Sequence, residues 1–169
     1  NEFFDITRFN LSKIEIDLEK TNLSRMIEQV CNEFIPVLMQ KGLTWNLAIT
    51  PDIFIMCDTD KILRVFDNLI RNAINYSYND TEIKCSLTLE DNVVYFKIKN
   101  KGKTIAPEKL KRIFEQFFRL DSSRGTATGG AGVGLAIAKE IVELHGGTIT
   151  AESRDESIAF QVALPLSEP

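Results

Sequence analysis

The sequence predicts an α+β fold, a two-layer sandwich in which helices cover one face of a mixed, mostly antiparallel sheet. First, runs of alternating apolar residues mix with amphipathic helical patterns but do not alternate with them one for one, as a doubly wound parallel sheet would require. Second, short connections join two pairs of strand-like runs, which is typical of antiparallel hairpins. Third, 169 residues, 44% of them hydrophobic, suffice for one domain with a substantial core.

Apolar spacing and capping residues predict the elements of the first half. Thr21 and Asn22 can cap a helix that Pro36 is expected to kink and Gly42 to end. A second strong helical pattern follows the N-cap candidate Asp58. The expected elements are the end of a helix at 3–9, a strand at 14–18, a helix from 23 to 42, strands at 43–50 and 53–57, and a helix at 61–77.

The second half is expected to contain two hairpins separated by helices. Polar residues at 90–92 join the two strands of the first hairpin. Pro107 suits the first turn of a short helix, and Gly146 and Gly147 stop the last helix before the second hairpin. The expected elements are strands at 82–89 and 93–100, a helix at 107–117, a helix that follows the glycine-rich segment and ends at 145, and strands at 148–153 and 158–165.

Composition excludes several classes of protein. The net charge of −4 argues against a nucleic-acid binder, and no apolar run approaches the roughly 20 residues of a membrane span. Cys31, Cys57 and Cys85 are odd in number and far apart, so we expect reduced thiols in the core and neither a disulfide framework nor a zinc site. Because the chain opens without methionine and in the middle of a pattern, we expect a piece of a longer protein.

A glycine-rich segment stands before the last helix. Gly130, Gly132 and Gly134 open that helix, where backbone N–H groups can approach phosphate oxygens and the helix dipole favours an anion. The segment lacks the Lys-Ser/Thr pair of a Walker loop, and no strand directly precedes it as in a dinucleotide fold. It is a candidate phosphate site whose type depends on the residues that accompany it.

An asparagine stripe runs along the helix predicted at 61–77. At helical spacing Asn68, Asn72 and Asn75 lie on one face with Tyr76 beside them, although asparagine is a mediocre helix former. A solvated polar face and a ligand site explain this stripe equally well. In the second case, neutral amide oxygens could bind Mg²⁺ and amide nitrogens could donate to phosphates.

Two further positions are candidates for ligand contacts. Asn100, Gly102 and Ile105 stand where a strand ends, so the polar side chain could contact a base edge, although a plain strand-to-helix turn would also explain them. Arg119 stands at the mouth of the glycine-rich segment and could meet a terminal phosphate, as could Arg124.

In this order and spacing, the segments resemble the catalytic, ATP-binding domain of bacterial sensor histidine kinases. Its fold, the Bergerat or GHKL fold, is shared with gyrase, chaperone and mismatch-repair ATPases. The stretches that carry the resemblance are 64–77 (the N box), 100–105 (the G1 box), 113–121 (the F box) and 129–147 (the G2 box). The wording of 2–10 and 99–102 is similar to the vancomycin-resistance sensor kinases. The resemblance implies that 1–12 is the end of a second dimerisation helix with its linker, and that 13–166 is the catalytic domain.

For the base of ATP, the resemblance implies four contact residues. Tyr76 would border the adenine or the ribose, and Asn100 would meet the exocyclic amine of adenine. Gly102 would leave room for the base, and Ile105 would lie on its face.

For the phosphates, the resemblance implies that Asn72 is the Mg²⁺ ligand and that Asn68 and Arg119 act on the phosphate side. The residues expected to line the triphosphate, beneath a lid at about 120–131, are Gly130, Gly132, Val133, Gly134 and Leu135.

Asn68 bears on the type of reaction. Relatives that hydrolyse ATP have a glutamate there to activate water, whereas an amide cannot act as a general base. The resemblance therefore implies transfer of the ATP γ-phosphate to a histidine in a separate dimerisation domain, for relay to a response regulator. The single histidine, His145, is expected to have a structural role at a helix end, so the acceptor lies outside this chain.

Several positions depart from the family pattern. Asn100 stands in place of the usual aspartate, Thr104 in place of a glycine, Asn75 in place of a basic residue, and 157–160 in place of a glycine-threonine segment. These departures keep a degenerate nucleotide-binding interaction module open as an alternative, and the glycine-rich lid shared across the fold keeps a same-fold ATPase or clamp open. The resemblance further implies a monomeric cytoplasmic fragment of a homodimeric membrane sensor.

Overall fold

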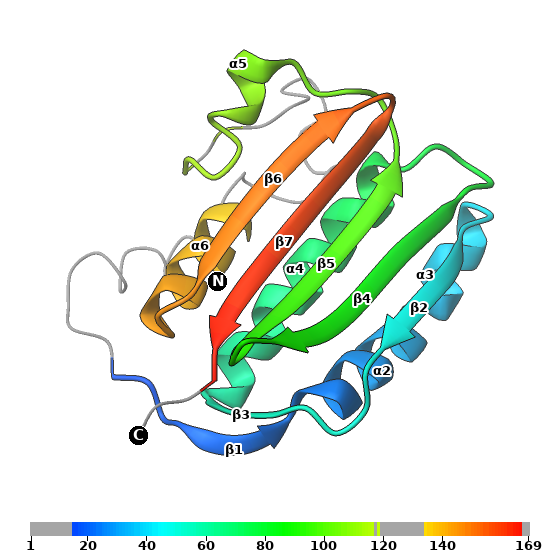
Figure 1. Ribbon diagram of the computed structural model, residues 1–169. Coiled ribbons are helices and arrows are strands. Elements are labelled where there is room, and N and C mark those ends of the chain that lie inside the picture. Colours follow the sequence, from blue (N-terminus) through cyan, green and yellow to red (C-terminus); the bar gives the residue numbers. More distant parts are fainter. Residues whose placement is uncertain (1–14, 117, 119–133, 167–169) are drawn as a thin grey trace.

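The computed structural model describes residues 15–116, 118 and 134–166, and it has helices on one face of a five-stranded sheet (Figure 1). The strand order is β2-β4-β5-β7-β6, with β2 parallel to β4 and every other neighbouring pair antiparallel. The strands are β2 (Thr44–Ile49), β4 (Glu82–Glu90), β5 (Val93–Lys101), β6 (Thr148–Arg154) and β7 (Ser157–Pro165). The predicted α+β sandwich is therefore confirmed.

Three helices form the second layer, α2 (Leu23–Glu33), α4 (Thr59–Tyr76) and α6 (Gly134–Leu144). Every second residue of a strand faces these helices. On β5, Val94, Phe96 and Ile98 are buried, whereas the side chains of Lys97 and Lys99 are exposed on the other face. The residues of α4 that complete this core are Ile62, Val65, Phe66, Leu69, Ile70, Ala73 and Ile74.

The central helix α4 is fixed along its whole length. The rings of Phe66 and Phe96 pack with centroids 4.7 Å apart, and burial of each such side chain stabilises the fold by about 1.5–3 kcal/mol. At its C-terminal end, Lys41 Nζ donates to the carbonyl oxygens of Ile74 at 2.7 Å and Ser77 at 3.1 Å. Burial lowers the pKa of Lys41. The ammonium group thus occupies the end of the helix where the backbone dipole favours a positive charge.

Two elements in the first half of the chain differ from those predicted. The helix expected from 23 to 42 is interrupted at Phe34 and continues as α3 (Ile35–Gln40), with Pro36 in the first turn of the new helix. The strand expected at 14–18 is wrong, because strand β1 is Glu19–Asn22 and pairs antiparallel with β3 (Phe54–Cys57). The backbone N–H of Asp17 instead donates to Asp58 Oδ2 at 3.0 Å, which holds this stretch outside the β1–β3 ladder.

The helix expected at 107–117 is shorter than predicted. Helix α5 is Pro107–Leu110, and residues 111–116 continue as turns and a bend. The helix end expected at 3–9 and residue 117 lie outside the described residues.

All three cysteines are free and buried, as predicted for core thiols. A hydrogen bond with Cys31 together with burial raises the pKa of the Cys85 thiol, so this thiol stays protonated near neutral pH. Within the described ranges, no helix combines the length and the apolar character that crossing a membrane requires.

Candidate functional site

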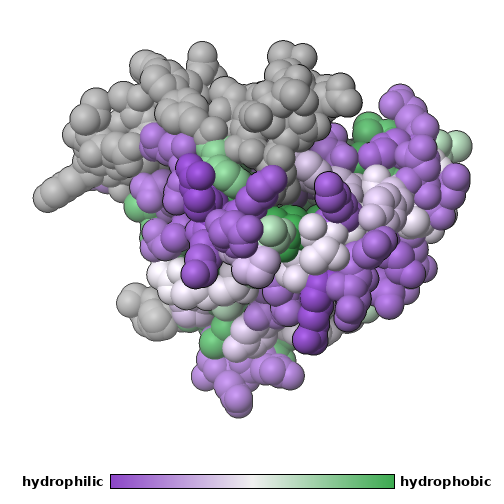
Figure 2. All heavy atoms as spheres, turned by 90° about the horizontal axis from the view of Figure 1, so that it is seen from above, coloured by the Kyte–Doolittle hydropathy of each residue, from purple (hydrophilic) through white to green (hydrophobic). Residues whose placement is uncertain are grey.

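The sequence-predicted site residues that the structure describes lie on α4, on α6 and in the segment that follows β5. Helix α4 and strand β5 both end at the upper end of the molecule in Figure 1. Among the described residues seen from above, hydrophilic ones predominate, with a small hydrophobic area near the centre of the view (Figure 2). The site is thus assembled from segments far apart in the sequence.

Asn100 is a polar residue at a core position. It continues the inward-facing series of Val94, Phe96 and Ile98 on β5, and its exposed fraction is 3%. Its Nδ2 atom has no hydrogen-bond partner among the described residues. An unpaired buried donor costs about 1–3 kcal/mol, and native proteins seldom leave one without a reason. The amide is therefore suited to a ligand that supplies the missing acceptor.

Gly102 lies where the end of β5 comes closest to the end of α4. A Cβ atom at this position would lie 2.1 Å from the backbone oxygen of Tyr76 and 3.1 Å from Asn100 Nδ2. No side chain fits there without moving backbone atoms. The glycine is required by this close approach, and no side chain from position 102 presses on the Asn100 amide.

The segment that follows Asn100 is fastened to the turn between β6 and β7. Gly102 N donates to the Glu156 carbonyl oxygen at 3.1 Å, and Glu156 N donates to Thr104 Oγ1 at 2.8 Å. Ile105 N donates to Ser153 Oγ at 2.9 Å, and the Ile105 side chain is buried in the core. Thr104, which departs from the family pattern, thus has a defined role, because a glycine would offer no acceptor to Glu156.

On the other side of the site, α4 meets the start of α6. Asn68 Nδ2 donates to the backbone oxygen of Gly134 at 3.0 Å. Asn72 and Tyr76 follow at intervals of four residues, so the half-buried side chains of all three lie on one face of α4. Leu135, the residue after Gly134, packs against the hydrophobic core. The predicted residues Arg119, Gly130, Gly132 and Val133, as well as Arg124 and the expected lid, lie outside the described residues.

Two contacts near the site gave no recognisable signal in the sequence, the capping lysine Lys41 and the Thr104–Glu156 hydrogen bond. Each joins residues more than 30 positions apart. Asp155 and Glu156 both have positive φ, so they form the tight turn between β6 and β7. The sequence alone does not show that this turn lies beside the segment after β5.

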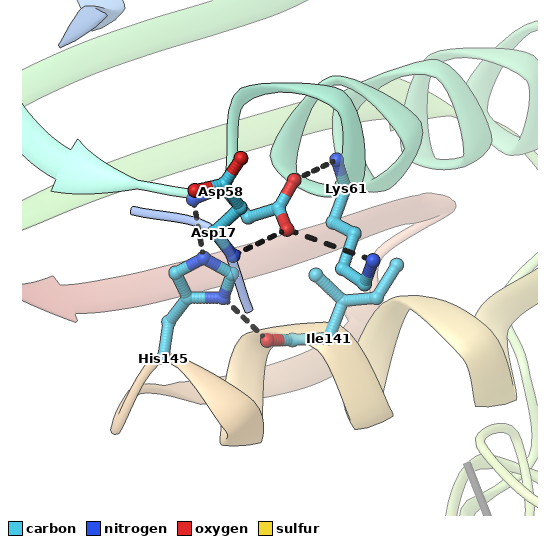
Figure 3. Close-up of polar contacts among 5 residues, drawn as sticks. All are labelled: Asp17, Asp58, Lys61, Ile141 and His145. Carbon is cyan, nitrogen blue, oxygen red and sulfur yellow. Dashed lines mark hydrogen bonds and ion pairs between the residues drawn. The ribbon is translucent and has the colours of Figure 1, made fainter. Parts of the chain in front are cut away.

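His145 follows the last residue of α6, at the other end of this helix from Gly134. It lies beside Asp58 and Asp17 (Figure 3). Its Nε2 atom accepts a hydrogen bond from the backbone N–H of Asp58 at 3.0 Å, so the ring proton is on Nδ1, which donates to the Ile141 carbonyl oxygen at 2.8 Å. Both ring nitrogens are used, and the expected structural role is confirmed.

Asp58 is the centre of the same cluster. Its carboxylate accepts from the backbone N–H of Lys61 at 3.3 Å and of Asp17 at 3.0 Å, and Lys61 Nζ lies 3.6 Å away. Burial by itself raises the pKa of Asp58, but these hydrogen bonds and the Lys61 charge lower the pKa below its ordinary value. The ionised carboxylate therefore stabilises the folded chain.

Asp58→Ala is expected to lower the free energy of unfolding by about 1–2 kcal/mol at pH 7, since it removes the N-cap of α4. Because the folded pKa is lowered, this contribution is present above the unfolded pKa of about 3.9 and is lost as the pH falls through the folded pKa. Urea unfolding at a series of pH values should show the gap between wild type and variant narrowing below about pH 4. Asp60→Ala, at an exposed neighbour, is the control. A difference between wild type and Asp58→Ala that does not change with pH would contradict the stabilising role of the ionised Asp58 carboxylate.

The comparisons with known proteins agree with this geometry. The model of the family described as "Histidine kinase-, DNA gyrase B-, and HSP90-like ATPase" matches residues 57–168. Sensor protein VanSC of Enterococcus gallinarum is 53% identical over 98% of this chain and 45% of its own length. Sensor protein VanS of Enterococcus faecium is 44% identical over 98% of this chain and 43% of its own length. The chain thus spans less than half the length of these two relatives.

Solved structures show the same fold. The catalytic domain of histidine kinase ThkA, 26% identical, superposes with a TM-score of 0.80 over 90% of this chain and 100% of that chain. Acinetobacter baumannii histidine kinase AdeS has a TM-score of 0.81 at 23% identity, over 99% of this chain and 76% of that chain. The resemblance to the sensor histidine kinases, including the vancomycin-resistance sensors, is confirmed. The chain belongs to the ATPase family that unites histidine kinases with DNA gyrase B and HSP90.

Proposed function

We propose that this chain is the ATP-binding catalytic domain of a two-component sensor histidine kinase. It passes the γ-phosphoryl group of ATP to a histidine in a separate dimerisation domain of the same protein, for relay to a response regulator. The observation that carries the proposal is the unpaired, buried Nδ2 of Asn100 beside the close approach at Gly102. A bound base supplies the acceptor that this donor lacks, so the residues present fit a nucleotide.

In this proposal the base of ATP lies at the end of β5. Asn100 hydrogen-bonds to the edge of the base, and Gly102 leaves the space that a side chain would fill. Tyr76 borders the adenine or the ribose, and Ile105, held through its backbone N–H by Ser153, lies against the ring. Since Asn100 is fixed by strand pairing and Gly102 by its hydrogen bond with Glu156, the base side is organised before ATP arrives.

The triphosphate lies between α4 and the first turn of α6. The carboxamide oxygen of Asn72 would hold Mg²⁺, and as a neutral ligand it adds no charge repulsion to an anionic nucleotide. Bound Mg²⁺ offsets the charge of the phosphate oxygens. Asn68 fixes the start of α6 through Gly134, next to Leu135. The other residues proposed for this side are Arg119, Gly130, Gly132 and Val133.

Asn68 supports phosphoryl transfer over hydrolysis. Its amide nitrogen donates to Gly134, and a carboxamide cannot take a proton from water near neutral pH. An imidazole nitrogen can attack the γ-phosphorus without a base on the enzyme. The new N–P bond then forms as the bond from phosphorus to the bridging oxygen breaks, and ADP leaves with that oxygen.

The proposal also covers the parts of the protein beyond the site. We assign 13–166 to the catalytic domain and 1–12 to the end of the second dimerisation helix with its linker. The whole protein would be a homodimeric membrane sensor with this domain on the cytoplasmic side, and the fragment alone would be a monomer. The identity to VanSC and VanS over nearly the whole chain supports this assignment.

A phosphorylation assay tests the proposal. The chain is joined to a histidine-bearing dimerisation domain taken from VanSC, because VanSC is 53% identical to this chain over 98% of its residues. The joined protein is then given Mg·ATP labelled at the γ-phosphate. We expect acid-labile, base-stable label on that domain, lost when its acceptor histidine becomes glutamine. Chelation of Mg²⁺ should lower the rate by at least about 100-fold, since the metal offsets charge at the transferred group.

Two outcomes would contradict the proposal. Steady release of phosphate by the chain alone, without label on any histidine, would identify a hydrolysing ATPase or clamp. Absence of Mg·ATP binding at millimolar nucleotide in calorimetry would identify a degenerate interaction module.

A further inference from the structure

The group that faces the base in the proposed site is a carboxamide. Asn100 is 3% exposed and occupies the last inward-facing position of β5. The charged side chains beside it in the sequence, Lys99 and Lys101, are exposed on the opposite face of the strand. The base is therefore met here by a neutral side chain that offers both a donor and an acceptor.

A carboxamide and a carboxylate select different bases. Near neutral pH a carboxylate only accepts hydrogen bonds, so it pairs with the 6-amino group of adenine and repels a 6-oxo group. A carboxamide presents an oxygen acceptor and a nitrogen donor side by side. It therefore matches the edge of adenine, with its amino donor and N1 acceptor, and after turning over it matches the edge of a 6-oxopurine, with its oxygen acceptor and N1–H donor.

The Asn100 amide is not held in one orientation by a hydrogen bond of its nitrogen to a described residue. Its Nδ2 atom has no partner among the described residues, so turning breaks no hydrogen bond of that atom. On the side of Gly102 there is no side chain, and the position of a missing Cβ lies 3.1 Å from Nδ2. The terminal torsion of asparagine is broad, which keeps both orientations accessible.

We propose that Asn100 makes the site accept 6-oxopurine nucleoside triphosphates, those of inosine and guanosine, as well as ATP. This inference rests on the proposed function, because it concerns the base of the same nucleotide. It widens the substrate class from adenine nucleotides to purine nucleotides and assigns the choice to one side chain.

Calorimetry of the chain with Mg·ATP and Mg·ITP tests the proposal, since the two bases differ only at position 6 and in the proton on N1. We expect the wild-type dissociation constants to lie within about tenfold of each other. In Asn100→Asp, binding of ITP should weaken at least about 100-fold relative to ATP, because the 6-oxygen then faces an acceptor. Asn79→Asp, which adds the same charge at an exposed turn, should leave the ratio unchanged. Mg·GTP should follow Mg·ITP.

The outcomes separate this inference from the proposed function. Wild-type chain that binds ATP but rejects ITP by more than about 100-fold would overturn the inference and leave the proposed function standing. An unchanged ratio in a folded Asn100→Asp variant would also overturn it, because another group would then set the selectivity. Chain that binds no nucleotide would overturn both. The comparison of Mg·ATP with Mg·ITP binding by the wild-type chain tests the inference even where Asn100→Asp fails to fold.

Discussion

Gly102→Ala is expected to weaken Mg·ATP binding by at least about 100-fold, since displacements of about 1 Å in a site have effects of that size. The added Cβ would lie 2.1 Å from the Tyr76 backbone oxygen, and it is this oxygen or the Gly102 backbone that must move. Neither moves easily, because Tyr78 N donates to the Lys101 oxygen at 2.8 Å and Lys41 holds the nearby carbonyls of α4. The same clash should lower the free energy of unfolding by about 1–3 kcal/mol.

Calorimetry with Mg·ATP and urea unfolding measure the two effects of Gly102→Ala. Gly134→Ala is the matched control for stability, since its Cβ would lie 3.7 Å from the nearest atom, Asn68 Cγ, an ordinary contact distance. We expect that control to unfold within about 0.5 kcal/mol of wild type. A Gly102→Ala protein with unchanged affinity for ATP would show that the base does not lie at the end of β5.

Asn72→Ala is expected to reduce phosphoryl transfer at least about 100-fold, because it removes the proposed Mg²⁺ ligand and with it the offset of charge at the reacting phosphates. Its effect on folding should be small, since Asn72 is half-buried and alanine is the better helix former. Loss of transfer would therefore report on chemistry at the site. The assay with the joined dimerisation domain measures the rate, and titration of Mg²⁺ should show a weakened metal dependence.

Asn79→Ala is the control for this measurement, because it removes the same type of side chain from an exposed turn just after the same helix. Transfer by this variant should stay within about threefold of wild type, the size expected of a surface change away from the site. Equal loss in both variants would mean that the effect is not specific to Asn72. Unchanged transfer in Asn72→Ala would remove this residue from the site.

Periodicity was sufficient to predict the two layers and most of their elements. The alternation in β5 also implied that Asn100 faces the core, since it continues the series from Val94 to Ile98. What periodicity could not predict is that Asn100 Nδ2 lacks a partner, because this depends on the arrangement of every neighbouring side chain. The need for glycine at 102 likewise depends on how closely β5 approaches α4 in space.

The predictions that were wrong concern segments whose structure depends on distant partners. The short apolar alternation around Ile16 fits a strand, but the hydrogen bond of Asp17 with Asp58, 41 positions away, competes with that pairing. The short helix after Pro107 ends after one turn, and short helices have little stability of their own. At Thr104 the sequence showed only a departure from the family glycine, because the bond of Thr104 with Glu156 joins residues 52 positions apart.

The burial of Cys31, Cys57 and Cys85 has a practical consequence for spectroscopy on this protein. Their exposed fractions are 0%, 0% and 2%. Burial raises the pKa of Cys57, and the hydrogen bond with Cys31 together with burial raises the pKa of Cys85. Thiol reagents reach exposed thiolates, so the folded protein should leave all three unlabelled. A cysteine introduced at an exposed position, such as Lys103→Cys next to Gly102, would then be the single site of attachment for a fluorophore or spin label, with every native thiol retained.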